Sequence, residues 1–381
     1  MNRSFLFGLS ALLHAFVGWR LVPALMAWPG LAFALVFVLA VSMLLMPLGF
    51  LGRRLRSRRA VQALAWGGML AMGLFSSLFV FTVLREAVLL VATLAAWAWP
   101  GALPAGAVAR WSAVAVAGAA ALVTVVGAWN ARRTAGIVPV DVPIDGLPEA
   151  LHGFTIAQIS DIHVGPTIGA GYVHGIVDAV NRLGADMVAV TGDLVDGSVA
   201  DLAAHVAPLA RLASRHGTFF VTGNHEYYSG AHAWIAELRR LDVQVLLNEH
   251  VVLRHGEASL VIAGVTDPSA HHFDPTHRSS PQASLAGAPD HAVVRVLLAH
   301  QPRSAAAAAD AGFHLQLSGH THGGQFWPWN HFVRLQQPFT AGLYRLRDLW
   351  VYVSRGTGYW GPPKRIGAPS EITHLRLVTA R

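Results

Sequence analysis

The first third of the chain is almost free of charged side chains, and this restricts what it can fold into. No Asp, Glu, Lys or Arg occurs in residues 21–52, 60–84 or 111–131. A helix needs about 20 predominantly apolar residues to cross the hydrocarbon core of a bilayer. The sequence therefore predicts that this part of the chain lies in a membrane.

Five apolar segments are expected to be helical, at 5–27, 30–51, 60–83, 87–105 and 109–130. The fourth is the weakest span, because two prolines and a glycine interrupt it near its end. We expect an all-α bundle of about five transmembrane helices over residues 1–131. Residues 132–150 are then a linker with a first strand, and residues 151–381 a separate folded domain.

The formal net charge of +7 belongs to the membrane part of the chain. Up to Glu149 there are 11 Lys and Arg against 4 Asp and Glu, whereas the remainder carries 17 of each. Arginines beside apolar segments are typical of membrane orientation, and a nucleic-acid binder should carry its basic surface on the folded domain. Nucleic acid is therefore not an expected partner. With no cysteine, disulfides and thiolate metal sites are excluded.

From Phe154 the pattern changes to short apolar runs that alternate with helix-length segments, which is typical of an α/β domain with buried strands. The expected strands are 154–159, 187–190, 218–221, 260–263, 293–298 and 315–317, with 137–142, 349–353 and 372–377 outside the alternating part. The expected helices are 170–183, 199–215 and 230–241.

Polar clusters follow five of these runs directly. They are Ser160-Asp161-Ile162-His163, Thr191-Gly192-Asp193, Thr222-Gly223-Asn224-His225-Glu226, Ala299-His300 and Ser318-Gly319-His320-Thr321-His322. The carboxyl ends of strands in an open α/β sheet lie along one edge, so distant clusters can form one site. An x-His step on an extended segment would also point both side chains to one side. Carboxylate, imidazole and amide donors suit Mn, Fe or Zn better than Mg or Ca.

The motifs DxH, GD, GNHE, H and GHTH, in this order over residues 137–381, resemble those of the calcineurin-like metallophosphoesterases. The resemblance implies a four-layer αββα sandwich that holds two divalent metal ions. By matching positions, one metal has the ligands Asp161, His163 and His322, and the other has Asn224, His300 and His320. Asp193 corresponds to the bridging carboxylate, and His225 to the acid near the leaving group.

Three further acidic residues near the motifs have more ordinary interpretations. Glu226 could orient His225, but capping of the following helix is favoured. Asp196 and Asp267 are expected to serve turns or caps rather than metals.

Two arginines and an aromatic loop follow the last motif. Arg355 and Arg365 could hold a substrate phosphate, although solvated arginines in turns are the alternative. The aromatic side chains of 323–329 could accept a lipid or a base, or could pack as a lid on their own domain.

The combination resembles transmembrane proteins with a C-terminal metallophosphoesterase domain, and implies an enzyme that hydrolyses a phosphodiester or diphosphate bond. Some relatives are linked to cleavage of UDP-2,3-diacylglucosamine in lipid A biosynthesis, so the resemblance implies a lipid-linked diphosphate or phosphodiester as substrate. A phosphomonoesterase or protein phosphatase is the first alternative. A transporter or sensor with a regulatory domain is the second, but the spans contain few ionisable groups for transport.

The expected location is the cell (inner) membrane, and the side of the catalytic domain depends on the number of spans. The arginine-rich loop is expected in the cytoplasm; it contains Arg53, Arg54, Arg56, Arg58 and Arg59. Five spans then place the catalytic domain outside the cytoplasm. Arg132 and Arg133 favour the cytoplasmic side, as would a re-entrant fourth segment. The count of five favours an extracytoplasmic domain.

Overall fold

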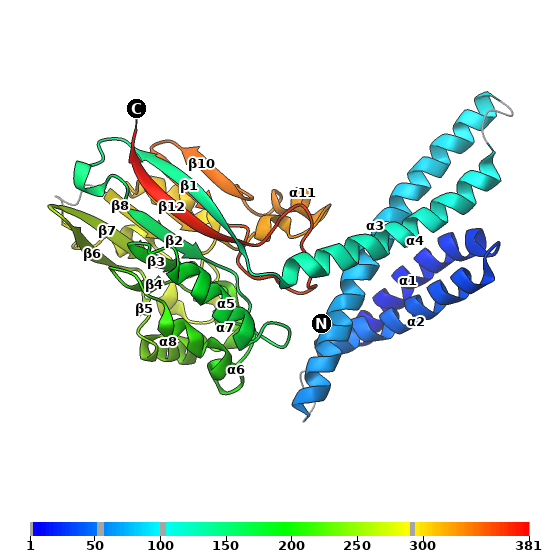
Figure 1. Cartoon of the computed structure of the whole chain (residues 1–381), viewed down its shortest axis with the longest axis horizontal. Helices are drawn as coiled ribbons and strands as arrows, with labels where there is room; N and C mark the ends of the chain where they lie inside the picture. Colours follow the sequence, from blue (N-terminus) through cyan, green and yellow to red (C-terminus); the bar gives the residue numbers. More distant parts are fainter. Residues whose placement is uncertain (1–2, 52–56, 100–103, 290–293, 381) are drawn as a thin grey trace. The chain divides into compact units, whose positions relative to one another are not determined.

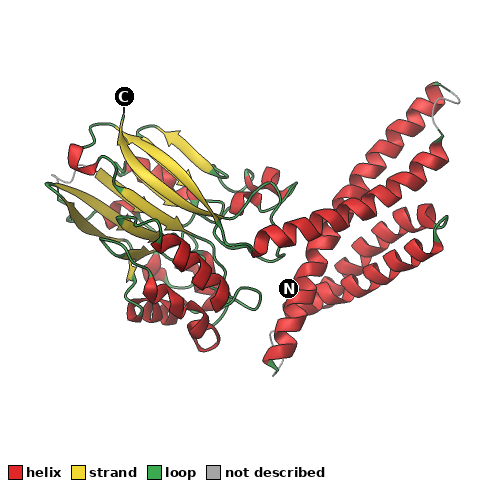
Figure 2. Cartoon of the chain, in the orientation of Figure 1, coloured by secondary structure: helices red, strands yellow, loops and turns green. Residues whose placement is uncertain are grey.

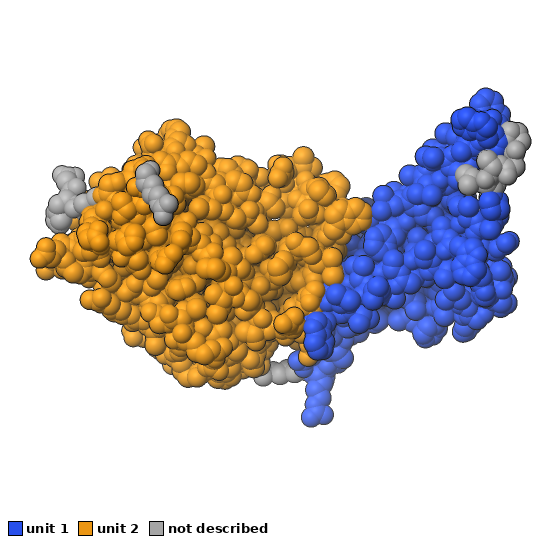
Figure 3. Space-filling model, turned by 45° about the horizontal axis from the view of Figure 1, so that its top comes forward, with its two compact units in different colours: residues 1–129, 361–364 blue, residues 130–360, 365–381 orange. Residues whose placement is uncertain are grey.

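The computed structural model describes residues 3–51, 57–99, 104–289 and 294–380. Its internal contacts divide the chain into two compact units (Figure 3). The first unit contains residues 1–129 and 361–364, and the second contains residues 130–360 and 365–381.

The first unit is built from helices that are long and apolar enough to cross a membrane (Figure 1). Within the described residues there are four of them: α1 (Arg3–Leu25), α2 (Pro29–Leu51), α3 (Arg58–Ala98) and α4 (Ala105–Arg132). Large apolar side chains such as Phe33 and Leu122 remain exposed on their surfaces, at 74% and 64%. Such exposure suits a helix that faces lipid rather than water.

Helix α3 joins two of the five segments that the sequence predicts as separate spans. It continues without a break from the 60–83 segment into the 87–105 segment. Neither proline nor glycine lies at the junction, and Arg85 there is satisfied by Glu86 Oε1 at 2.8 Å and Ser112 Oγ at 3.0 Å. At 41 residues the helix is about 60 Å long, twice the thickness of a hydrocarbon core. The end of the predicted fourth segment, 100–103, lies outside the described residues.

One short segment from the far end of the sequence belongs to the helical unit. Residues Gly361–Lys364 pack with the helices, and the Lys364 ammonium donates to Gly73 O at 2.9 Å and to Ser77 Oγ at 2.5 Å. Lys364 is 1% exposed, so these acceptors replace the water that a buried cation needs.

The second unit contains two six-stranded sheets, which confirms the predicted α/β class (Figure 2). The order in the first sheet is β1 (Gly136–Ile144), β12 (Glu371–Thr379), β2 (Thr155–Ile159), β3 (Met187–Val190), β4 (Thr218–Phe220) and β5 (Gln244–Val245). The order in the second sheet is β10 (Gly342–Leu346), β11 (Leu349–Val353), β9 (Leu315–Ser318), β8 (Val294–Leu298), β7 (Ala258–Gly264) and β6 (Glu249–His255).

The sheets pack face to face with helices on both outer sides, which is the predicted αββα sandwich. Ile156 of the first sheet and Val296 and Leu317 of the second belong to one fully buried apolar cluster between the sheets. The helices that pack outside the first sheet are α5 (Ala170–Asn181), α6 (Val199–Val206) and α8 (Ala231–Arg240). Outside the second sheet pack α9 (Pro281–Ser284) and α10 (Ala305–Asp310).

The remaining helical elements are short and lie in the connections. They are α7 (Asn224–Ser229), α11 (Trp329–Val333) and the 3₁₀ turns η2 (Glu149–Leu151), η3 (Ala207–Arg211), η4 (Ala270–His272), η5 (Pro275–His277), η6 (Pro302–Ser304) and η7 (His322–Gly324).

Strand direction decides where the polar clusters meet. Strands β2, β3 and β4 are parallel neighbours in the first sheet, and β7, β8 and β9 are parallel neighbours in the second. The loops after parallel neighbours leave a sheet at the same edge. Five loops from two packed sheets therefore converge on one region.

Candidate metal centre

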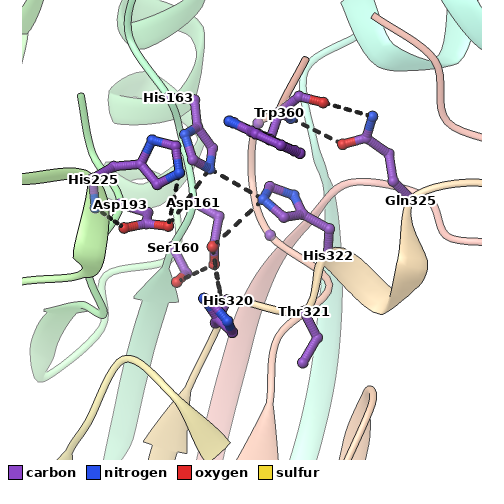
Figure 4. A network of polar contacts seen from close by, with 12 residues as sticks. Ser160, Asp161, His163, Asp193, His225, His320, Thr321, His322, Gln325 and Trp360 are labelled. Atoms are coloured by element: carbon purple, nitrogen blue, oxygen red, sulfur yellow. Dashed lines mark hydrogen bonds and ion pairs between the residues drawn. The ribbon is translucent and has the colours of Figure 1, made fainter. Parts of the chain in front are cut away.

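All seven predicted metal ligands follow strand ends at this edge, five of them in loops and two, Asn224 and His322, at the first residues of α7 and η7. Asp161 and His163 follow β2, Asp193 follows β3, and Asn224 follows β4. From the second sheet, His300 follows β8, and His320 with His322 follow β9. Figure 4 shows side chains from both sheets pointing toward a common centre.

The backbone at this centre is unusual, because five of the seven residues have positive φ. The φ angles are 54° at Asp161, 55° at His163, 51° at Asp193, 70° at His320 and 51° at His322. Non-glycine residues rarely adopt this conformation, which concentrates at functional sites. The prediction that the x-His steps lie on extended segments is therefore wrong. The pairs still share one site, because left-handed turns direct them there.

Two glycines permit this close approach of the loops. A Cβ at Gly319 would overlap the Ser160 hydroxyl and the Asp161 carboxylate, and a Cβ at Gly223 would overlap the Asp193 carboxylate. The glycines of the GNHE and GHTH motifs thus have a packing reason beyond turn flexibility.

The first group of candidate ligands contains Asp161, His163 and His322. One ligand atom from each lies within 4.8 Å of the others. The Nε2 atoms of His163 and His322 are only 3.1 Å apart, and His322 Nε2 is 3.6 Å from Asp161 Oδ1. Two imidazole nitrogens and a carboxylate oxygen that face one another are an arrangement that a divalent cation stabilises.

The second group contains Asp193, His300 and His320, with Asn224 beside it. His300 Nε2 is 3.1 Å from Asp193 Oδ2 and 3.2 Å from His320 Nδ1. Among the described residues, the buried Asn224 Oδ1 has no hydrogen-bond partner. A buried amide oxygen without a partner is costly, and a cation would remove that cost. The donors present therefore fit a metal.

Asp193 stands between the two groups. Its Oδ2 atom is also 3.9 Å from His163 Nε2, and it forms a further three-residue group with His163 and His225. This position is compatible with the bridging carboxylate that the family resemblance implies.

Asp196 holds two histidines of the centre, a role that the sequence interpretation as a turn or cap missed. Its Oδ1 atom is 3.1 Å from His163 Nδ1 and 2.5 Å from His225 Nδ1. A carboxylate on the second ring nitrogen fixes the orientation of a metal-binding imidazole. In the sequence, only the position of Asp196 three residues after Asp193 could have indicated this role.

Glu226 is a cap, as expected, and it does more than cap a helix. Its Oε2 atom accepts from the N–H groups of Gly223 at 2.7 Å and Asp193 at 3.0 Å, and its Oε1 accepts from Leu194 N at 2.8 Å. The side chain is fully buried. One carboxylate thus ties the start of α7 to the loop that carries Asp193.

His225 lies at the rim of the centre, next to the ligands His163 and Asp193. Its backbone N–H donates to Asp193 Oδ1 at 2.9 Å, and 16% of its side chain is exposed. Two exposed aromatic rings lie beside it, Tyr228 at 5.2 Å and Trp360 at 5.9 Å between ring centroids. Both rings contact the histidine edge to face, and Trp360 is visible next to the centre in Figure 4.

Charges within the centre shift one another strongly. Burial lowers the pKa of His163, but the surrounding carboxylates, Asp196 first, then Asp193 and Asp161, together outweigh burial and raise it to about 9. Burial and the neighbouring His300 lower the pKa of His320 to about 3. Burial opposes ionisation of Asp193, yet the imidazoles around it, His300 first, hold its pKa well below the usual range. A cation would replace the protons that such a cluster otherwise shares.

The two arginines predicted to bind substrate occupy different environments. Arg365 is 1% exposed; its guanidinium donates to the carbonyls of His322 and Arg355, and Nη2 lies 3.0 Å from His322 Nδ1. This placement favours positioning of His322 over contact with a substrate. Arg355 pairs with Glu371 Oε2 at 2.6 Å and keeps 30% of its side chain exposed.

Two other predicted features fall beside the centre. Asp267 forms a turn with Ser269 N at 2.8 Å and also accepts from Gln301, the residue after His300. In the aromatic loop, Phe326 is buried, whereas Trp327 and Trp329 are each 43% exposed. The loop therefore contributes both a packed and an exposed aromatic surface.

Comparisons with known proteins identify a family and several relatives of this chain. The model of the calcineurin-like phosphoesterase family matches residues 154–324. A Bos taurus protein named "Transmembrane protein with metallophosphoesterase domain" is 42% identical over 68% of this chain and 61% of its own length. A Helicobacter pylori protein named "Uncharacterized metallophosphoesterase" is 39% identical over 58% of this chain and 59% of its own.

A second bacterial relative is matched over most of its length. An Aquifex aeolicus protein, also named "Uncharacterized metallophosphoesterase", is 33% identical over 58% of this chain and 84% of its own. The match spans about three fifths of the bovine and Helicobacter proteins. Together with the four apolar helices, the bovine relative supports a membrane protein.

Proposed function

Because the chain belongs to the calcineurin-like phosphoesterase family, we propose that it is a membrane-anchored enzyme that hydrolyses a phosphodiester or diphosphate bond with two divalent metal ions. The observation that carries the proposal is the convergence of two ligand groups on one carboxylate, Asp193, beside the unpartnered oxygen of Asn224.

Each group would hold one ion. The first ion would be held by Asp161, His163 and His322, the second by Asn224, His300 and His320, and Asp193 would contact both. Two adjacent divalent ions supply charge for the phosphoryl oxygens and activate a water molecule as nucleophile. Nitrogen-rich donors without a thiolate favour Mn, Fe or Zn.

His225 would supply the proton to the leaving group. Asp196 holds its Nδ1, so the proton to be transferred would sit on Nε2. The backbone bond from His225 N to Asp193 keeps this imidazole at the edge of the centre, where a leaving group would depart. Asp196 thus orients an acid and a metal ligand together.

The substrate would carry a phosphate and an apolar or planar group. The exposed part of Arg355 would contact the phosphate, and Tyr228 and Trp360 offer two exposed rings beside the acid. A lipid-linked diphosphate such as UDP-2,3-diacylglucosamine combines these features. A membrane anchor raises the local concentration of such a substrate without new contacts.

We place the catalytic unit on the cytoplasmic side. With the four apolar helices of the described residues rather than five spans, a cytoplasmic loop between α2 and α3 returns the end of α4 to the cytoplasm, so the count of five no longer favours an extracytoplasmic domain. Arg3, Arg59, Arg132 and Arg133 then all lie near cytoplasmic helix ends. Arg53, Arg54 and Arg56 of the same loop lie outside the described residues.

The activity is tested with the full chain in detergent, stripped with a chelator and reloaded with Mn²⁺. We expect hydrolysis of bis-p-nitrophenyl phosphate and of UDP-2,3-diacylglucosamine, lost on chelation and restored by the ion. Faster turnover of p-nitrophenyl phosphate than of either would favour a monoesterase. A metal-loaded chain inert on all three would refute the proposal of an enzyme.

The membrane side is tested with one introduced cysteine, because the chain has none. Ala286 is exposed in the catalytic unit, so Ala286→Cys should be accessible to a maleimide. A membrane-impermeant maleimide should label it only after the inner membrane is opened. Labelling in spheroplasts with an intact inner membrane would place the unit outside the cytoplasm.

A further inference from the structure

A second group of metal-binding side chains lies on the surface of the catalytic unit, apart from the seven ligands of the buried centre. It contains His232 in α8, and Asp274 and His277 at the two ends of the turn η5. One ligand atom from each lies within 4.8 Å of the others. We call these three residues the surface triad.

The nitrogen–oxygen distances within the surface triad suit ligands around a cation better than hydrogen bonds between the side chains. His232 Nε2 is 3.0 Å and His277 Nε2 is 3.9 Å from the same oxygen, Asp274 Oδ2. The second distance is too long for a hydrogen bond. Zinc–ligand bonds of about 2.0–2.2 Å in tetrahedral geometry place neighbouring ligand atoms roughly 3.3–3.5 Å apart, between the two observed values.

The other polar side-chain atoms of Asp274 and His277 already have partners. Asp274 Oδ1 accepts from Thr276 N at 2.9 Å and Thr276 Oγ1 at 2.7 Å, which leaves Oδ2 for the histidines. His277 Nδ1 is 2.8 Å from the Tyr227 hydroxyl. An outer partner on the second ring nitrogen is a regular feature of metal-binding histidines.

Burial and charge also favour a metal here. His277 is 13% exposed, and burial lowers its pKa, which favours the neutral form that a metal requires. Asp274 supplies the single negative charge, and 73% of the His232 side chain is exposed, which gives an ion access from solvent.

We propose that the surface triad binds one zinc ion through His232 Nε2, Asp274 Oδ2 and His277 Nε2, with water as fourth ligand. The ion would join α8 to the connection between β7 and α9, two segments about forty residues apart in sequence. This connection also carries Asp267, which bonds to Gln301 beside His300. Zinc would therefore stiffen a loop next to the buried centre, and the proposal does not depend on the substrate.

The test compares zinc binding by the full chain and two matched double variants in detergent. H232A/H277A removes two ligands, whereas H271A/H272A removes two neighbouring histidines of the same connection that lie outside the triad. After chelation, Zn²⁺ is titrated against a chromophoric chelator, and bound metal is counted by mass spectrometry. We expect H232A/H277A to bind one zinc ion fewer per chain than the parent and H271A/H272A.

A single variant keeps the test independent of folding defects. Asp274→Asn changes one partly exposed side chain and should weaken zinc binding at the surface triad at least tenfold, because a neutral amide replaces the anionic ligand. Zinc should also slow hydrogen exchange of residues 270–280 in the parent but not in this variant. Equal zinc counts and affinities in all proteins would overturn the proposal.

Discussion

The buried centre and the surface triad use the same kinds of donor in opposite surroundings. Five ligands of the centre have positive φ, whereas the three described residues of the triad, Asp274, His232 and His277, do not. In the centre, Asp196 orients His163, and Glu226 accepts from the backbone of the loop that carries Asp193. In the triad, His232 is largely exposed. Strain and burial at the centre must be maintained by the whole fold, so changes there should be severe, and changes at the triad mild.

The largest effect is expected from Asp193→Asn. Loss of the carboxylate between the ligand groups should leave the repulsion between two cations uncompensated, weaken metal loading and lower kcat/KM by roughly a thousandfold or more. Activity and metal content of the purified chain measure both effects. Asp178→Asn, on the exposed side of α5, is the control and should change neither. Normal turnover with two bound ions in Asp193→Asn would contradict the assignment of this residue.

His225→Ala should separate chemistry from metal binding. Because its proposed part is proton transfer, turnover should fall about a hundredfold, while both ions of the buried centre remain bound. Metal analysis and kcat on an activated and an unactivated phosphodiester check this, since a good leaving group needs less help from an acid. Metal loss as large as in Asp193→Asn would instead make His225 a ligand.

Glu226→Gln probes the support of the centre rather than its ligands. The amide nitrogen would replace one of the two oxygens and face either the N–H groups of Gly223 and Asp193 or that of Leu194, so the free energy of unfolding should fall by about 2–3 kcal/mol. Urea denaturation followed by fluorescence measures the change. Glu257→Gln, at an exposed turn, is the matched control. A Glu226→Gln protein as stable as this control would show that the buried carboxylate is dispensable.

The smallest effect is expected from Asp274→Asn in the metal-free chain. Its carboxylate is solvent-accessible and its bonds to Thr276 can be kept by the amide oxygen, so the free energy of unfolding should change little. Thermal unfolding with and without Zn²⁺ measures this. Asp348→Asn, fully exposed in the turn between β10 and β11, serves as reference. A large loss of stability of Asp274→Asn without metal would show that the fold depends on the triad as it does on the buried centre, and would contradict the contrast between the two sites.

Much of the catalytic unit could be predicted because strand and ligand signals are local. The runs that form β2, β3, β4, β8 and β9 are apolar and end at polar clusters, so both the α/β class and the meeting of the clusters followed from the sequence. Span counting was less secure. The low hydropathy at Arg85 and Glu86 suggested a boundary between two spans. Helix α3 continues through this point because the Arg85 guanidinium bonds to Glu86 and Ser112.

The supporting residues could not be predicted, because their roles depend on distances across the fold. Asp196 touches two histidines that lie 33 and 29 positions away. Arg365 resembles a phosphate-binding side chain in the sequence, yet it is buried against His322, which lies 43 positions away. The surface triad is likewise formed by residues from α8 and a later turn, without a recognisable spacing.

The sequence by itself determined the membrane helices, the α/β unit and the donor types of the centre, since these follow from composition, periodicity and side-chain chemistry. The tertiary structure decided which donors meet, which residues adopt the left-handed conformation, and which polar groups are buried. Those outcomes depend on the packing of two sheets against each other. A nitrogen or an oxygen becomes part of a metal site only when that packing brings it within a few ångströms of its partners.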